Sequence, residues 1–307
     1  MRIAVMGTGG IGGYFGGRLA LAGHDVAFIA RGRQLEALRT RGLRLESQLG
    51  DAQLPTVAVT DDPAQLDPVD MVLFGVKLWD TEASAKLIEP LLTERTGVVS
   101  FQNGVVKDDI LRSVLGPEHV IGGVAYIAAT IAEPGVIRHS GPLQRLVFGE
   151  YDGSTSARVQ ELYDACAASG IDAEISGQIE QTIWEKFVFL VGLSGTTTTA
   201  RTPIGPIRSN PRARAFLHDV MDEVVQVAQA QGVPLPADFA DGRLAFIDTV
   251  PADMTSSMHH DLDRGNRLEV PWLSGDVVAR GTTLGIPTPC NRAITDILSV
   301  HSEGRAG

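Results

Sequence analysis

A glycine-rich turn near the start of the chain has the residue types and spacing of a phosphate-binding loop. Gly7, Gly9 and Gly12 form the pattern G-x-G-x-x-G, between an apolar run at 1–6 and a helical pattern that ends at Gly23. In such a unit the first glycine permits a tight turn, the second lets backbone N–H groups approach a pyrophosphate, and the third permits close contact of helix and strand. The positive end of the helix dipole favours the phosphates. The predicted dinucleotide-binding segment consists of Gly7, Thr8, Gly9, Gly10, Ile11 and Gly12.

The second predicted strand, residues 25–30, is followed by arginines rather than by an acid. An NAD site places Asp or Glu about 20 residues after the glycine motif, where the carboxylate binds the ribose 2′-OH. Here the strand is followed by Arg31 and Arg33, and a guanidinium can pair with a 2′-phosphate through bidentate, charge-assisted hydrogen bonds. We therefore expect NADP(H) rather than NAD(H), with Arg31 as the selectivity residue. Arg33 is equally well explained as a helper or as a solvated loop residue.

Two further polar residues follow predicted strands in the first half of the chain. Lys77 closes the strand predicted at 70–76, and Asn103 follows the strand predicted at 97–101. Open α/β sheets bind ligands at the carboxyl ends of their strands, so both side chains are candidates for contact with a cofactor or substrate. Each also has a structural explanation, Lys77 as a surface lysine and Asn103 as part of an Asn-Gly turn.

A lysine and a glutamate with apolar neighbours are the candidate acid–base pair. Lys186 lies in the helical segment 183–191, which is apolar on nearly every side and is therefore expected to be buried. Partial desolvation lowers the pKa of a lysine, which suits a general acid near neutral pH. Glu269, in the segment 265–272, is the partner that this interpretation assigns to Lys186. A lysine that snorkels to solvent and an ordinary structural salt bridge are the alternatives.

The polar stretch that precedes Glu269 gives weaker signals. Ser257 could hydrogen-bond a substrate carboxylate or cap a helix. His259 and His260 resemble a catalytic or metal-binding pair, but no cluster of Asp, Glu and His accompanies them at ligand spacing. We expect both histidines at the surface and no metal site.

The elements that must position these residues change in character along the chain. The first half alternates short apolar runs with helical patterns, as in a parallel α/β sheet. Residues 125–147 are rich in β-branched residues and predict an antiparallel extension of that sheet. Its expected turns are Pro134-Gly135 and Ser140-Gly141. The other predicted strand is 120–124, and the predicted helices are 81–92, 179–191, 212–231 and 268–284.

The predicted fold class is therefore α/β, with a Rossmann-type sheet, its antiparallel extension and an all-helical C-terminal domain. We expect the NADP-binding domain at residues 1–177 and a helical substrate and catalytic domain at 178–307. The last residues, 302–307, carry no pattern and are expected to form a disordered tail.

Composition restricts the class of partner. The 307-residue chain has a net charge of −11, which argues against nucleic-acid or anionic-membrane partners. Cys166 and Cys290 are too few for a disulfide framework, so a cytoplasmic location fits best. The uncharged stretch 187–200 is too short for a membrane span and is better explained as a buried helix. The long C-terminal helices could pack within one chain or across a homodimer.

Taken together, the motifs resemble the ketopantoate reductase family over nearly the whole chain. Their order and spacing carry the resemblance more than any one of them does. The matching positions are the segment 7–12, Arg31, Val76-Lys77, Gln102-Asn103-Gly104, Trp184-Glu185-Lys186-Phe187, Ser256-Ser257-Met258 with Asp261, and Glu269. The resemblance implies an NADPH-dependent reduction of a 2-keto acid to a 2-hydroxy acid, with ketopantoate, an intermediate of pantothenate biosynthesis, as the default substrate.

The resemblance also implies a role for individual residues. Lys186 matches the lysine that protonates the carbonyl oxygen, and Glu269 matches the carboxylate that holds this lysine and the substrate hydroxyl. Asn103 and Ser257 match substrate-binding positions, and Lys77 matches a lysine near the nicotinamide. In a dry cleft the Lys186 cation would stabilise and protonate the alkoxide that develops as hydride is transferred.

Four positions depart from the family's pattern and bear on the substrate. Leu190 and Ser194 stand where well-known members carry asparagines that grip the substrate, and Pro271 and Ser274 stand where they carry an acid and an asparagine. Loss of these polar groups weakens the binding of a hydroxylated substrate. Another, more apolar 2-keto acid is therefore an alternative substrate, and a non-catalytic NADP(H) sensor is the alternative from a different class.

Overall fold

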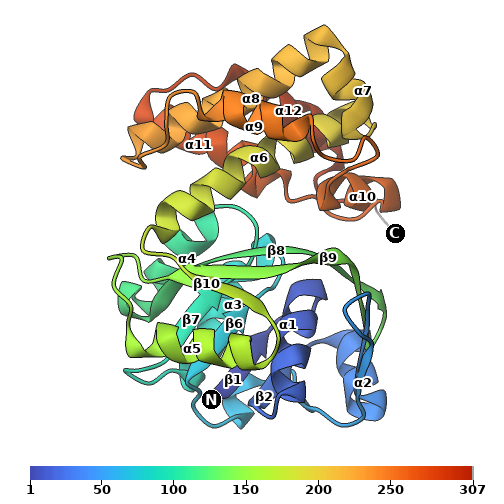
Figure 1. Ribbon diagram of the computed structural model, residues 1–307, viewed down its shortest axis with the longest axis vertical. Helices are drawn as coiled ribbons and strands as arrows, with labels where there is room; N and C mark the ends of the chain where they lie inside the picture. Colours follow the sequence, from blue (N-terminus) through green and yellow to red (C-terminus); the bar gives the residue numbers. More distant parts are fainter. Residues whose placement is uncertain (306–307) are drawn as a thin grey trace. The chain divides into compact units, whose positions relative to one another are not determined.

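Parallel strands form the central sheet of the first unit (Figure 1). In the computed structural model, which describes residues 1–305, they lie in the order β5-β2-β1-β6-β7-β8. Their bounds are β1 Arg2–Met6, β2 Asp25–Ile29, β5 Ala58–Thr60, β6 Met71–Phe74, β7 Gly97–Ser100 and β8 Val120–Glu133. This is the 3-2-1-4-5-6 order of doubly wound nucleotide-binding sheets. The order reverses between β1 and β6, so the loops after these two strands flank the point where such sheets bind ligands.

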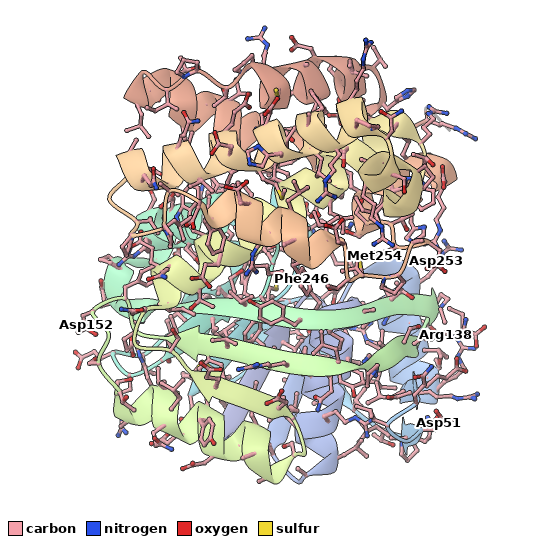
Figure 2. The ribbon with its side chains drawn as sticks, turned by 45° about the horizontal axis from the view of Figure 1, so that its top comes forward. Asp51, Arg138, Asp152, Phe246, Asp253 and Met254 are labelled. Carbon is pink, nitrogen blue, oxygen red and sulfur yellow. The ribbon has the colours of Figure 1, made fainter. Side chains whose placement is uncertain are left out.

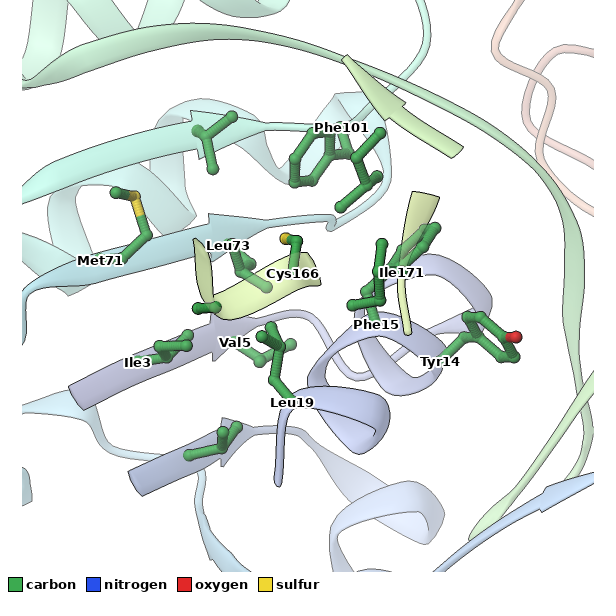
Figure 3. Close-up of a cluster of buried hydrophobic side chains, with 14 of the residues drawn as sticks. Ile3, Val5, Tyr14, Phe15, Leu19, Met71, Leu73, Phe101, Cys166 and Ile171 are labelled. Atoms are coloured by element: carbon green, nitrogen blue, oxygen red, sulfur yellow. The ribbon is translucent and has the colours of Figure 1, made fainter. Parts of the chain in front are cut away.

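Both faces of the inner strands β1, β6 and β7 are buried because successive side chains enter two different hydrophobic cores. Ile3 and Val5 belong to one core (Figure 3), and Ala4 and Met6 belong to the other. The first core also contains side chains of two helices, α1 (Gly10–Leu21) and α5 (Ala157–Ala168), and the second contains side chains of α3 (Thr81–Ile88) and α4 (Val106–Leu115). Strands covered on both faces appear in sequence as continuous apolar runs, which is why β1, β6 and β7 could be predicted. The short, partly exposed strand β5 was not predicted.

A long antiparallel hairpin extends the sheet as predicted. β8 pairs with β9 (Val136–Gly149), and the turn at Pro134-Gly135 is confirmed. The predicted turn at Ser140-Gly141 is wrong, because both residues lie inside β9. The pairing there changes from Ile127↔Gln144 to Ala128↔Ser140, which leaves residues 141–143 as a bulge with Gly141 at φ +79°.

The remaining elements of the first unit lie around this framework. Three further strands join the hairpin sheet: β3 (Leu43–Ser47), β4 (Ala52–Leu54) and β10 (Asp172–Ile175). Helix α2 spans Gly32–Arg41, and short 3-10 segments are η1 (Pro63–Gln65), η2 (Leu78–Asp80), η3 (Glu89–Leu91) and η4 (Pro117–His119).

Every described element after β10 is helical, which confirms the predicted fold class. The helices are α6 (Ile179–Ala200), α7 (Ile204–Ser209), α8 (Pro211–Ala230), α9 (Phe239–Ile247), α10 (Ser257–Arg264), α11 (Ser274–Leu284) and α12 (Pro289–Leu298), with 3-10 segments η5 (Val270–Trp272) and η6 (Ser299–His301). The chain divides into two compact units, Met1–Asn103 with Lys107–Thr182 and Gly104–Val106 with Ile183–Gly307. No helix within residues 1–305 has the length and apolar character that a membrane span requires.

Two helix predictions in the second unit need correction. The helix predicted at 179–191 continues to Ala200, because the uncharged stretch that follows is itself helical and largely buried. The single helix predicted at 268–284 is instead η5 followed by α11. Pro271 lies in the first turn of η5. Leu273 has φ −108° and ψ −100°, outside the helical region, so a separate helix, α11, begins at Ser274.

The described part of the expected C-terminal tail is ordered. The Leu268 N–H donates to the Ser302 carbonyl oxygen at 2.9 Å, and the Arg305 N–H donates to that of Gly265 at 2.9 Å. The prediction of a disordered tail is therefore wrong for residues 302–305. Its last two residues, 306–307, lie outside the described part of the chain.

Candidate active site

The glycine-rich loop joins β1 to α1, as the motif predicts. Gly7 adopts φ +94°, and its N–H donates to the Ile29 carbonyl oxygen at 3.2 Å. A Cβ on Gly7 would lie 2.8 Å from the Val76 backbone nitrogen, and a Cβ on Gly12 would lie 2.3 Å from the Gly7 carbonyl oxygen. Close packing of the backbone therefore requires glycine at both positions. Gly10 is required in the same way, since its Cβ would lie 2.1 Å from the Ala129 carbonyl oxygen.

Gly9 is different from the other glycines of the loop. A Cβ on Gly9 would meet no atom within 4 Å, so the backbone at the N-cap of α1 is open to an approaching group. The first turn of α1 carries no acidic residue, and the N–H groups at a helix start favour an anion. This open helix N-terminus, placed at the reversal of strand order, fits the pyrophosphate of a dinucleotide.

The two residues of the motif that carry larger side chains contribute mainly to structure. Thr8 is only 3% exposed, and its hydroxyl donates to the Ile29 carbonyl oxygen at 3.2 Å. Ile11 is half-buried against the core that α1 shares with α5. Contacts of Thr8 with a bound cofactor would therefore come from its backbone rather than from its hydroxyl.

Arg31 lies at the carboxyl end of β2, as expected. It is exposed at the N-cap of α2, and within residues 1–305 its guanidinium makes no hydrogen bond or ion pair. The same holds for exposed Arg33. The neighbouring Gln34 Nε2 donates to the Thr8 carbonyl oxygen at 3.0 Å, while its Oε1 accepts from the Gly135 N–H at 3.0 Å. Gln34, which the sequence did not single out, thereby fixes the start of α2 against the glycine-rich loop.

Lys77 and Asn103 follow β6 and β7, on the same side of the sheet as the glycine-rich loop. Lys77 is exposed and its Nζ lies 5.6 Å from the ring centroid of Trp79. Asn103 is half-buried. The neighbouring Gln102 is buried and donates through Nε2 to the Val76 carbonyl oxygen and to the Thr81 hydroxyl, both at 2.9 Å. Gln102 therefore joins the loop that carries Lys77 to the loop that carries Asn103.

A hollow of the first unit lies at the opposite edge of the sheet, beside the amino ends of the strands. It has a volume of about 720 Å³ and is lined partly by Met1, Asp70 and Val120, which stand at the starts of strands. None of the predicted site residues lines it. Within residues 1–305, no group of three or more His, Cys, Asp and Glu side chains is placed to hold a metal ion.

In the second unit, Lys186 and Ser194 both lie on α6. Lys186 is half-buried, whereas Ser194 is 1% exposed and its Oγ has no hydrogen-bond partner within the described residues. Gly195 brings α6 close to the start of α11, because a Cβ on it would lie 3.4 Å from the Ser274 Oγ, which also has no partner there. Buried hydroxyls of this kind are normally satisfied by a ligand or by ordered water.

Ser257 occupies the first turn of α10, but it is not the capping residue. Ser256 is the N-cap and its Oγ accepts from the His259 N–H at 3.1 Å. The prediction that both histidines lie at the surface is wrong for His259, which is 8% exposed. Its Nδ1 lies 2.9 Å from the Thr197 carbonyl oxygen of α6, so His259 holds the start of α10 against α6. His260 is exposed, as expected.

Glu269 is buried, at 8% exposure, immediately before η5. Its burial agrees with the expectation drawn from its apolar neighbours. The pairing of Glu269 with Lys186 stays a prediction.

The strand order, the open glycine-rich loop at the reversal point and the helical second unit define a Rossmann-type nucleotide-binding protein. Comparison with known protein families identifies which Rossmann-type proteins this chain belongs to. The chain belongs to the ketopantoate reductase family: the family model "Ketopantoate reductase PanE/ApbA" matches residues 3–153, and its C-terminal counterpart matches residues 178–302. The protein is therefore an oxidoreductase.

Individual relatives agree with the family assignment over nearly the full length. A 2-dehydropantoate 2-reductase of Archaeoglobus fulgidus is 34% identical over 298 residues, covering 97% of this chain and 96% of its own. The Bacillus subtilis protein named "Uncharacterized oxidoreductase YkpB" is 30% identical over 292 residues, covering 94% and 95%. The crystal structure of a PanE/ApbA family ketopantoate reductase from Ralstonia eutropha JMP134 is 36% identical, with a TM-score of 0.89 and 98% of each chain covered.

Proposed function

We propose that this protein reduces a 2-keto acid to the 2-hydroxy acid with NADPH, and that ketopantoate is the substrate favoured by the family. The observation that carries the proposal is that half-buried Lys186 and buried Glu269 are both present in the helical unit of a chain that belongs to this reductase family. The relatives named as 2-dehydropantoate 2-reductases support the same reaction. Reduction of ketopantoate would place the protein in pantothenate biosynthesis.

The cofactor assignment rests on the first unit, which we propose as the NADP-binding domain. The open backbone at Gly9 can receive the pyrophosphate, and exposed Arg31 stands where a 2′-phosphate would be bound. Lys77 and Asn103 follow the adjacent strands and would contact the rest of the cofactor. When bound, the reduced nicotinamide supplies the hydride.

The chemical roles in the second unit follow the polarity of the reaction. As hydride adds to C2 of the keto acid, negative charge develops on the carbonyl oxygen, and the Lys186 ammonium stabilises that charge and donates the proton. Glu269 orients Lys186 and accepts a hydrogen bond from the substrate hydroxyl. Asn103, Ser194 and Ser257 are proposed to bind the substrate, Ser194 through its otherwise unpartnered hydroxyl.

The test of these roles is the rate of NADPH oxidation with a 2-keto acid in wild type and in Lys186→Ala. General acid catalysis contributes about 10²- to 10⁴-fold, so kcat is expected to fall by about that factor, with little change in the dissociation constant of NADPH. Lys86→Ala is the matched control, because Lys86 is exposed on α3 and paired with Glu82. Unchanged turnover in Lys186→Ala would remove Lys186 from the mechanism, and NADPH binding by a wild type without turnover would favour a sensor.

A further inference from the structure

The face of α6 that carries Lys186 continues into apolar residues. Phe189 and Leu190 lie three and four residues after Lys186, the spacing that places side chains next to one another on a helix, with Cβ atoms about 5–6 Å apart. All three residues are half-buried. The proposed proton donor therefore has an aromatic and an aliphatic side chain as its immediate neighbours along the helix.

A second aromatic residue extends this apolar surface. The ring of Phe246 on α9 packs edge-on against Phe189, with 5.5 Å between centroids and an interplanar angle of 66°. Phe246, which is labelled in Figure 2, is nevertheless 48% exposed. Arg243, one turn earlier on α9, lies with its guanidinium carbon 5.8 Å from the Phe246 centroid and 4.7 Å from that of Phe239. The Phe246 ring is thus held between Phe189 and Arg243.

Three features of the surface formed by Phe189, Leu190 and Phe246 indicate which chemical groups it can bind. An aromatic side chain fixed by two neighbours and half-exposed presents a preformed apolar surface, and a ring placed against it gains both burial and edge-to-face contact. Phe189 and Leu190 share a helix face with Lys186. A substrate whose carbonyl oxygen meets Lys186 would therefore bring the side chain attached to its carbonyl carbon to this apolar surface. Phe189, Leu190 and Phe246 offer no side-chain hydrogen-bond partner to a hydroxyl.

We propose that Phe189, Leu190 and Phe246 bind the side chain of the substrate, and that the preferred substrate is a 2-keto acid with an aromatic or fully apolar branched side chain. This inference rests on the proposed function, since it assumes that Lys186 protonates the substrate carbonyl. Phe189, Leu190 and Phe246 give the hydroxyl of ketopantoate no hydrogen-bond partner, so that only the proposed contact with Glu269 would offset the loss of its hydration. Ketopantoate is therefore reduced less efficiently than its apolar counterparts.

The sharpest test compares ketopantoate with trimethylpyruvate, which differs from it only by the absence of the hydroxyl. Phenylglyoxylate represents a substrate with an aromatic side chain. Pyruvate is the reference, because its single methyl group is too short to make much contact with the apolar surface. We expect kcat/KM for trimethylpyruvate and phenylglyoxylate to exceed that for ketopantoate by about tenfold or more. Phe246→Ala is expected to lower kcat/KM for phenylglyoxylate by about tenfold, mainly through KM, and that for pyruvate by less than about threefold.

The controls separate this role from a structural one. Phe246→Leu, which keeps an apolar side chain, should recover most of the activity toward trimethylpyruvate but not toward phenylglyoxylate. Ile297→Ala, at an exposed apolar position on α12, should leave the substrate preference unchanged. The oligomeric state of Phe246→Ala is measured alongside, because dissociation of an oligomer would show that a second copy covers this surface and would overturn the proposal.

The outcomes distinguish this inference from the function on which it rests. A tenfold preference for ketopantoate over trimethylpyruvate, or a Phe246→Ala variant with wild-type preference, would overturn the inference and leave the 2-keto acid reductase intact. Failure to reduce any of the four acids with NADPH would overturn both.

Discussion

The Gln102 side-chain amide donates a hydrogen bond of 2.9 Å to the Val76 carbonyl oxygen. This bond crosses from the end of β7 to the loop after β6, and a second bond of 2.9 Å from the same nitrogen reaches the Thr81 hydroxyl. The Gln102 Oε1 in turn accepts from the Ser100 hydroxyl at 3.0 Å. One buried amide thereby fixes the relative positions of the segments that carry Lys77 and Asn103.

Replacement of this amide should loosen the cofactor site as well as the fold. Gln102→Ala leaves the part-buried Val76 carbonyl and the buried Thr81 hydroxyl without their donor, which costs about 1–3 kcal/mol of unfolding free energy. We also expect several-fold weaker NADPH binding. Urea unfolding and a fluorescence titration measure the two effects. The control is Gln160→Ala on α5, where the side chain bonds only Asp164 among residues 1–305. A loss of stability without any change in NADPH affinity would limit Gln102 to a structural role.

The glycine-rich loop permits a contrast between two alanine substitutions. A Cβ on Gly9 meets no neighbouring atom, so the melting temperature of Gly9→Ala should lie within about 2 °C of that of wild type. The variant should nevertheless bind NADPH at least about tenfold more weakly, because the added methyl group occupies the space of the phosphates. Gly12→Ala places a Cβ 2.3 Å from the Gly7 carbonyl oxygen and should lose stability by about 1–3 kcal/mol. Thermal unfolding and NADPH titration of both variants check this. Undiminished affinity in Gly9→Ala would contradict the phosphate site.

The charge at Arg31 should decide between the two nicotinamide cofactors. Hydrogen bonds to charged groups contribute about 1.5–3 kcal/mol, so Arg31→Ala is expected to weaken NADPH binding about 10- to 100-fold and to change NADH binding little. Arg39→Ala, on the same helix but paired with Asp61, is the matched control. Equal losses for NADPH and NADH would defeat the assignment of the 2′-phosphate to Arg31.

The Glu150–Arg158 pair should make stability depend on acid pH. Burial acts to raise the pKa of Glu150, but hydrogen bonds from Arg158 and Ser156, together with the Arg158 charge, outweigh it and hold the pKa below its ordinary value of 4.5. A carboxyl with a lowered pKa contributes stability above its unfolded-state pKa and loses that contribution as pH falls through its folded-state pKa.

The corresponding variant is Glu150→Gln. We expect it to be less stable than wild type by about 1.5–3 kcal/mol at pH 7, with the difference shrinking below pH 4.5. Urea unfolding at several pH values measures this, with the exposed Glu161→Gln as control. A difference that stays constant from pH 7 to acid would contradict the assigned cause of the shift.

Local patterns were sufficient to predict much of the first unit. The strands 71–74 and 97–100 are buried on both faces, so their apolar runs are continuous in sequence, and the glycine spacing reflects steric demands within a single β1–α1 turn. The end of β2 also follows from a local apolar run, which is why the sequence alone places Arg31 there.

The features that were missed depend on partners far along the chain. Gln102 belongs to a segment that carries the family resemblance, but its bridging role gives no signal until Val76 and Thr81 are placed beside it. Gln34 gives no signal until Gly135 is placed beside it. His259 is polar and carries the pattern of a surface residue, but the Thr197 carbonyl, 62 positions earlier, gives it a buried partner. Ser140-Gly141 has the composition of a turn, and only pairing with β8 makes it a bulge.

Reduction of a 2-keto acid by NADPH can be measured in a single assay. NADPH oxidation should be followed by absorbance with purified wild type and each of ketopantoate, trimethylpyruvate, phenylglyoxylate and pyruvate, and the 2-hydroxy acid should be quantified by chromatography. We expect one 2-hydroxy acid formed per NADPH oxidised for at least one of these acids, with loss of turnover in Lys186→Ala. Absence of 2-hydroxy acid from all four, in a protein that still binds NADPH, would contradict the assignment as a 2-keto acid reductase.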